Sequence, residues 1–138
     1  MNKITVFWGF AIWASMMTFV GATFADHTVD DDITNVGFVL YTKSHAPGTL
    51  NARWLYSTQY RGAGIATGGP AQGYAGQYHV RYYFEDGAVG DEYDLHIEKV
   101  GPIYHVDWLA DGQRKATGVG METAEGLSVG WMHVSDGS

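Results

Sequence analysis

Apolar and polar residues alternate along most of the second half of this chain. The apolar members of four such stretches are Tyr78, Val80, Tyr82 and Phe84; Tyr93, Leu95 and Ile97; Tyr104, Val106 and Trp108; and Leu127, Val129 and Trp131. Glycine-containing turns separate the stretches, among them Asp86-Gly87 and Asp111-Gly112. Period-two alternation bounded by turn residues is typical of half-buried antiparallel strands. The pattern therefore predicts an all-β domain.

The same reasoning gives eight strands in all. Residues 36–43, 49–58 and 61–67 form the first three, a Gly- and Pro-rich loop follows at residues 68–73, and a further strand carries Val119 and Met121. Regular spacing of about 8 to 12 residues per strand and turn indicates a sandwich or a barrel. We favour a single antiparallel barrel, because closure removes the exposed edges that promote aggregation.

Pairs of alternate glycines lie within two of these strands. They are Gly62 with Gly64 and Gly118 with Gly120. Such glycines either permit the bending and close backbone approach that a small barrel needs, or only fill space. The first interpretation supports barrel closure.

The N-terminal segment predicts export. A basic start at Lys3 is followed by an uncharged, mostly apolar run, and small residues at Thr23 and Ala25 precede the acidic Asp26. This is the layout of a secretory signal peptide, although the run also approaches the length of a membrane anchor. We predict a signal peptide at residues 1–25, a flexible acidic lead-in at 26–35 and a barrel domain at 36–138. The expected location is periplasmic or secreted, with no membrane attachment unless the segment stays uncleaved.

Charge and composition exclude several functions. After removal of residues 1–25, seven Lys and Arg face fifteen Asp and Glu, a net charge of minus eight. Nucleic-acid binding is disfavoured, because it depends on clustered basic residues. The chain of 138 residues has no cysteine, which excludes disulfides, thiol nucleophiles and Cys-ligated zinc.

Four segments of the chain carry a family resemblance. They are Gly-Gln-Tyr-His-Val-Arg-Tyr from Gly76, Gly-Pro-Ile-Tyr-His-Val-Asp-Trp from Gly101, Gly-Val-Gly-Met-Glu from Gly118 and Leu-Ser-Val-Gly-Trp from Leu127. Together they resemble a group of small exported bacterial proteins of calycin-like appearance, some of which carry a fibronectin-binding label. The match covers about half the chain and consists of structural residues. It implies a lipocalin-like or streptavidin-like barrel and transfers no catalytic residue.

Three histidines form a candidate metal site. If Tyr82 pairs with Tyr93, and Leu95 pairs with Val106, then His79, His96 and His105 form one row on the polar face. Directly opposed residues lie close enough for such a row to bind a divalent transition metal. The default interpretation is a set of solvated surface histidines, so we expect no cofactor.

Two carboxylate pairs are candidate acid–base groups, namely Glu98 with Asp107 and Asp91 with Glu92. Such a division of roles needs environments that separate the two pKa values. The alternation places Glu98 and Asp107 on the polar face, where solvent keeps both ordinary. The serines lack a nucleophile-elbow motif.

A set of aromatic residues provides the candidate ligand site. Its members are Trp54, Tyr56, Tyr78, Tyr82, Phe84, Tyr93, Tyr104, Trp108 and Trp131. Eight-stranded barrels are either filled by side chains or hold one small ligand, and the same aromatic residues suit both. We predict a monomeric or weakly oligomeric binding protein for a small apolar ligand or an extracellular macromolecule. The alternatives are a barrel enzyme of the cyclase or isomerase type and an adhesin-like surface protein.

Overall fold

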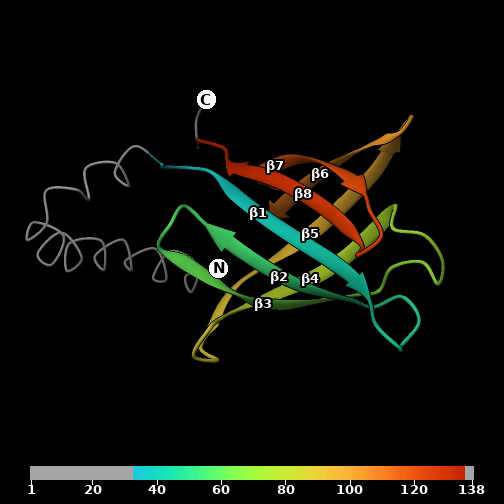
Figure 1. Ribbon diagram of the computed structural model, residues 1–138, viewed down its shortest axis with the longest axis horizontal. Coiled ribbons are helices and arrows are strands. Elements are labelled where there is room, and N and C mark those ends of the chain that lie inside the picture. The colour runs from blue at the N-terminus through green and yellow to red at the C-terminus, as the bar shows by residue number, and fades with distance from the viewer. Residues whose placement is uncertain (1–32, 136–138) are drawn as a thin grey trace, which may run out of the picture. The chain divides into compact units, whose positions relative to one another are not determined.

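The computed structural model describes residues 33–135, which form a closed barrel of eight antiparallel strands (Figure 1). The strands are β1 (Gly37–Lys43), β2 (Leu50–Tyr56), β3 (Tyr60–Thr67), β4 (Gly76–Phe84), β5 (Val89–Val100), β6 (Ile103–Ala110), β7 (Gln113–Glu122) and β8 (Leu127–His133). Each strand pairs with the next, and β8 returns to β1 with Val39 opposite Val129. The predicted all-β fold, strand number and closure are confirmed.

Two predictions concern the segment before the barrel. The signal peptide at residues 1–25 and most of the lead-in at 26–35 lie outside the described residues. Within residues 33–135, no helix is long and apolar enough to cross a membrane.

The core follows directly from the alternation in sequence. Every second residue of each strand points inward, and the aliphatic side chains at the centre of the barrel, including Leu50, Leu95 and Val106, have no measurable exposure. Burial of each such side chain stabilises the fold by about 1.5–3 kcal/mol. In the absence of disulfides, this inner layer of aliphatic and aromatic residues holds the barrel together.

Glycines on the inner face make room for the large rings. A Cβ atom at Gly64 would lie 2.6 Å from Cδ1 of Tyr82, and one at Gly62 would lie 2.9 Å from Nε1 of Trp54. On β7, a Cβ at Gly118 would lie 2.4 Å from the backbone oxygen of Gly130 on the neighbouring strand. Real Cβ contacts are longer than this, so the interpretation of these glycines as points of close approach is correct.

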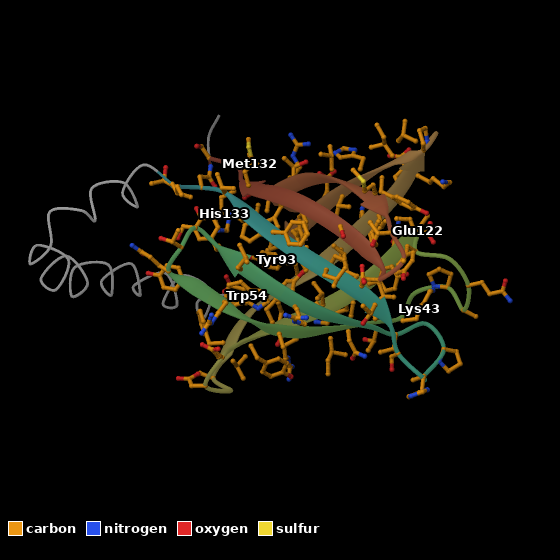
Figure 2. The ribbon with its side chains drawn as sticks, in the orientation of Figure 1. Lys43, Trp54, Tyr93, Glu122, Met132 and His133 are labelled. Carbon is orange, nitrogen blue, oxygen red and sulfur yellow. The ribbon has the colours of Figure 1, made fainter. Side chains whose placement is uncertain are left out.

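The two ends of the barrel differ. One end holds the turns β2–β3, β4–β5 and β6–β7, together with the start of β1 and the end of β8. The other end holds the remaining four connections. In Figure 2, Trp54 and His133 lie towards the first end, while Lys43 and Glu122 lie towards the second.

A loop covers the second end, which we call the covered end. Residues 68–75 join β3 to β4, and their Tyr74 is only 8% exposed. The Tyr78 hydroxyl donates to the Tyr74 carbonyl oxygen at 2.9 Å. Lys43 donates to the Gly73 carbonyl oxygen and lies 4.9 Å from the centre of the Tyr74 ring. The loop is therefore fixed to the barrel at several points.

Both irregularities of the barrel pairing lie towards the opposite end. On β5, Gly90 and Asp91 together oppose Tyr82, since Arg81 pairs with Glu92 and Tyr83 with Val89. A second bulge falls between β6 and β7 beside Trp108. A bulge bends its strand and re-aims the neighbouring side chains, and barrel rims are common places for it.

Candidate functional site

Half-buried aromatic side chains line the end opposite the covered one, which we call the aromatic end. Its rings lie near the ends of β2, β4 and β8 and belong to Trp54, Tyr56, Phe84, Trp131 and His133. Tyr56 stacks on Trp131 with ring centroids 5.0 Å apart, and His133 meets both rings edge-on. Trp54 meets Phe84 edge-on at 5.7 Å. These contacts order the rings while leaving part of each one accessible.

A hydrogen-bonded group of three side chains lies below these rings and crosses the interior. The Tyr82 hydroxyl accepts from Nε1 of Trp108 at 2.7 Å and shares a hydrogen bond with the Tyr41 hydroxyl at 2.5 Å. The three residues come from β4, β6 and β1. Burial raises the pKa of Tyr82 to about 12 and that of Tyr41 well above its usual value, so both stay neutral. This Tyr41–Tyr82–Trp108 group occupies the middle of the barrel.

Asp91 is the one buried acidic residue among residues 33–135. It shares the inward phase of Tyr93 and Leu95 on β5, and only 9% of it is exposed. Its Oδ2 atom accepts from the Tyr93 hydroxyl at 3.0 Å, whereas Oδ1 has no hydrogen-bond partner in the part of the chain that the structure describes. Burial raises the pKa of Asp91 to about 6, although the Tyr93 hydrogen bond opposes this.

Asp91 is connected to the aromatic rings of this end through its neighbours Gly90 and Tyr93. The Tyr93 ring, which holds the carboxyl group, lies 6.3 Å from the Tyr82 ring, and that ring lies 6.3 Å from Trp54. A Cβ atom at Gly90, the residue before Asp91, would lie 3.6 Å from Cε2 of Phe84. A polar group capable of accepting or releasing a proton therefore adjoins an apolar aromatic surface.

Asn35 joins the first and last strands at the rim. Its Oδ1 accepts from the His133 amide at 2.7 Å and from the Tyr56 hydroxyl at 3.1 Å, and its Nδ2 donates to the His133 carbonyl oxygen at 3.2 Å. Burial lowers the pKa of His133 below its usual value. His133 is therefore neutral at physiological pH and adds no positive charge to this end.

All nine aromatic residues proposed from the sequence take the inward phase of their strands, but they do not form one site. Four line the aromatic end, namely Trp54, Tyr56, Phe84 and Trp131. Tyr82, Tyr93 and Trp108 lie deeper, in the middle of the barrel. Tyr78 and Tyr104 belong to the covered end, where Tyr104 donates to Glu122 at 2.9 Å.

The predicted histidine row does not form, because its assumed register is wrong. Tyr93 pairs with Val80 rather than with Tyr82, so His79 lies opposite Asp94. His96 lies opposite Asp107, and His105 opposite Glu98. His79 instead binds Glu92 at 2.8 Å on the outer face. Among residues 33–135, no group of three or more His, Asp or Glu side chains is placed to hold a metal ion.

The carboxylate pair Asp91 and Glu92 also separates, whereas Glu98 and Asp107 both lie on the outer face, as predicted. Asp91 points inward, while Glu92 points outward between His79 and Arg81, whose Nε lies 2.9 Å from Glu92. The hydrogen bond from His79 lowers the pKa of Glu92, as does Arg81. Of these four carboxylates, Asp91 is the one that is buried on the inner face. The sequence alternation indicates the inward placement of Asp91, because Asp91 continues the series of alternate residues Tyr93, Leu95 and Ile97.

No protein-family model, curated protein or solved structure matches the chain. By its fold and its candidate site, the protein is a closed eight-stranded antiparallel barrel with one covered end and one aromatic end, near which lies a buried carboxyl group.

Proposed function

We propose that this protein is an exported barrel of the calycin type that binds one small, mainly apolar molecule at its aromatic end. The observation that carries the proposal is the buried Asp91 carboxyl group, whose Oδ1 lacks a partner among residues 33–135 and which lies near the start of β5, at the end of the barrel with the half-buried aromatic rings. Binding sites for small molecules are typically apolar surfaces with a few placed polar groups. The aromatic end has this composition.

The rest of the barrel directs a ligand to that end. The Tyr41–Tyr82–Trp108 group fills the middle of the interior, and Tyr74 with its loop covers the opposite end. A ligand seated on Trp54 and Trp131 would rest above the filled middle. We therefore expect a single compact molecule rather than a long chain threaded through the barrel.

The predicted export agrees with the same role. The basic start, the apolar run and the small residues before Asp26 favour a signal peptide, and a small, monomeric or weakly oligomeric barrel in the periplasm or outside the cell would suit capture of a molecule from solution. The resemblance to calycin-like exported proteins agrees with this proposal.

Native mass spectrometry of the protein in the form that its own host produces tests the proposal. We expect one additional small mass per chain. The variant Trp131→Ala should lose it, while Met132→Ala, which alters an outward side chain on the same strand, should retain it. A bare protein that also fails to bind the neutral naphthalene dye prodan would show the proposal to be wrong.

Catalysis is the second candidate, because the same carboxyl group can move a proton. Its pKa of about 6 is suited to proton exchange near neutral pH. In a proton-shift isomerisation, Oδ1 of Asp91 would take a proton from one carbon of the ligand and return it to another. Incubation of the captured ligand with the protein in heavy water would then exchange a carbon-bound hydrogen, and Asp91→Asn protein saturated with the same ligand would not catalyse the exchange.

A further inference from the structure

The Asp91 carboxyl group leaves one interaction unfilled. Oδ2 is occupied by the Tyr93 hydroxyl, whereas Oδ1 is buried without a partner among residues 33–135. An unpaired buried oxygen of this kind is costly and rare in folded proteins. A ligand that donates a hydrogen bond to Oδ1 would remove that cost.

The backbone places Asp91 near the aromatic end, two residues after the start of β5. The bulge places Gly90 and Asp91 together opposite Tyr82, so the strand bends at this point. Phe84 lies against Gly90, and Tyr93 holds the carboxyl group from below. Oδ1 is therefore the carboxylate oxygen of Asp91 that lacks a hydrogen-bond donor among the described residues, while Oδ2 is held by the Tyr93 hydroxyl.

The nearby basic side chains are occupied elsewhere. Arg81 binds Glu92 at 2.9 Å and Arg61 binds Glu85 at 2.9 Å, both between exposed side chains. His133, the basic group on the rim, has a pKa lowered by burial and is neutral. Among residues 33–135 no basic side chain is bonded to Asp91, so a positive charge beside it would come from the ligand.

We propose that the ligand is a small organic cation, a protonated amine on an apolar body, whose N–H donates to Oδ1 of Asp91 while its charge lies over the aromatic faces. This inference rests on the proposed function and names its ligand class. Carboxylates form their strongest hydrogen bonds with charged donors, and aromatic faces attract ammonium groups. The net charge of −7 adds a long-range attraction for cations.

Three probes with the same ring and nearly the same length test the inference: phenethylamine, phenethyl alcohol and 3-phenylpropionate. Binding is measured by calorimetry at about pH 7.5 on the full-chain protein. The control variant is Asp94→Asn, which removes a carboxylate from the same strand but from its outer face, where the side chain is 64% exposed. The test variant is Asp91→Asn, whose fold is checked by circular dichroism.

We expect the amine to bind wild-type protein at least tenfold more tightly than the alcohol, and the acid to bind most weakly. Asp91→Asn should weaken the amine at least tenfold and leave the alcohol nearly unchanged, while Asp94→Asn should match the wild type. Equal binding of amine and alcohol, or an amine affinity indifferent to Asp91→Asn, overturns the inference but leaves the proposed function standing. Failure of all three probes also overturns it, and dye binding and native mass spectrometry then decide the proposed function separately.

Discussion

Replacing Asp91 with Asn should stabilise the barrel at neutral pH and remove a pH dependence of folding. The substitution keeps the shape of the side chain and an oxygen that can accept from Tyr93. It removes the negative charge that burial disfavours. The expected gain is therefore electrostatic and changes with pH, unlike the effect of a change in packing.

The magnitude follows from the pKa. Asp91 has a folded-state pKa of about 6 against an ordinary value of 3.8, and each pKa unit is worth about 1.4 kcal/mol. Because the folded pKa is raised, the folded state binds more protons than the unfolded state between these two values. Its stability therefore falls as pH rises through that window, by about 3 kcal/mol in all from this group. Below about pH 3.8 the penalty is absent, and above about pH 6 it is complete.

Urea unfolding of both proteins at several values from about pH 3.5 to about pH 7.5 measures the effect. Other groups, such as Glu92 with its lowered pKa, stabilise the fold as pH rises, but they do so in both proteins. The difference in free energy of unfolding between Asp91→Asn and wild type isolates Asp91. It should grow by about 3 kcal/mol across the range, in favour of the variant. A difference that stays constant, or that shrinks with rising pH, would refute the assignment of Asp91 as a desolvated carboxyl group.

Three further substitutions test the interior and the rim by urea unfolding. Gly64→Ala should lower the free energy of unfolding by about 1–3 kcal/mol, because its new Cβ clashes with the Tyr82 ring. The control Gly130→Ala, whose new Cβ meets nothing within 4 Å, should lower it much less. Equal effects would contradict a close approach of Gly64 to the Tyr82 ring. Tyr82→Phe should lower the free energy of unfolding by about 2–5 kcal/mol, because it leaves the Tyr41 hydroxyl and the Trp108 N–H without their partner. Tyr41→Phe removes a single hydrogen bond and should lower it by only about 1 kcal/mol. The reverse order would show that Tyr82 is not the centre of the Tyr41–Tyr82–Trp108 group. Asn35→Ala should cost about 2 kcal/mol, since it removes three hydrogen bonds and places Ala at a φ of 50° that it disfavours. The control Asn35→Gly removes the same hydrogen bonds but tolerates this φ, so it should cost less than Asn35→Ala. No loss in either variant would argue against Asn35 as a clasp, a side chain whose hydrogen bonds join the start of β1 to the end of β8.

The strand pattern predicted the faces of the barrel better than it predicted the neighbours across strands. Tyr93 was expected opposite Tyr82 and lies opposite Val80, and Leu95 was expected opposite Val106 and lies opposite Trp108. Both errors are slips of two residues, which leave every side chain on its predicted face but change its partner. The aromatic residues therefore kept their inward placement, while the histidine row was lost.

The candidate site depended on features with weaker sequence signals. The bulge at Gly90 and Asp91 sets the local register, and it depends on contacts between strands rather than on alternation within one strand. The covering role of Tyr74 depends on how a loop folds over the barrel end, which periodicity does not describe. Asp91 was visible in the inward series of β5, but an acidic residue is expected on an outer face unless a neighbour such as Tyr93 is known to hold it.

The clasp made by Asn35 and His133 brings the start and the end of the barrel together at its aromatic rim (Figure 1). Adjacent chain ends are the condition under which a protein tolerates circular permutation. A short linker from His133 to Asn35, with new ends cut between Glu125 and Gly126 in the β7–β8 turn, would move both termini to the covered end. Such a permuted barrel would present its aromatic rim free of chain termini. An affinity tag added at the new termini would then attach the protein to a solid support with that rim facing the solvent.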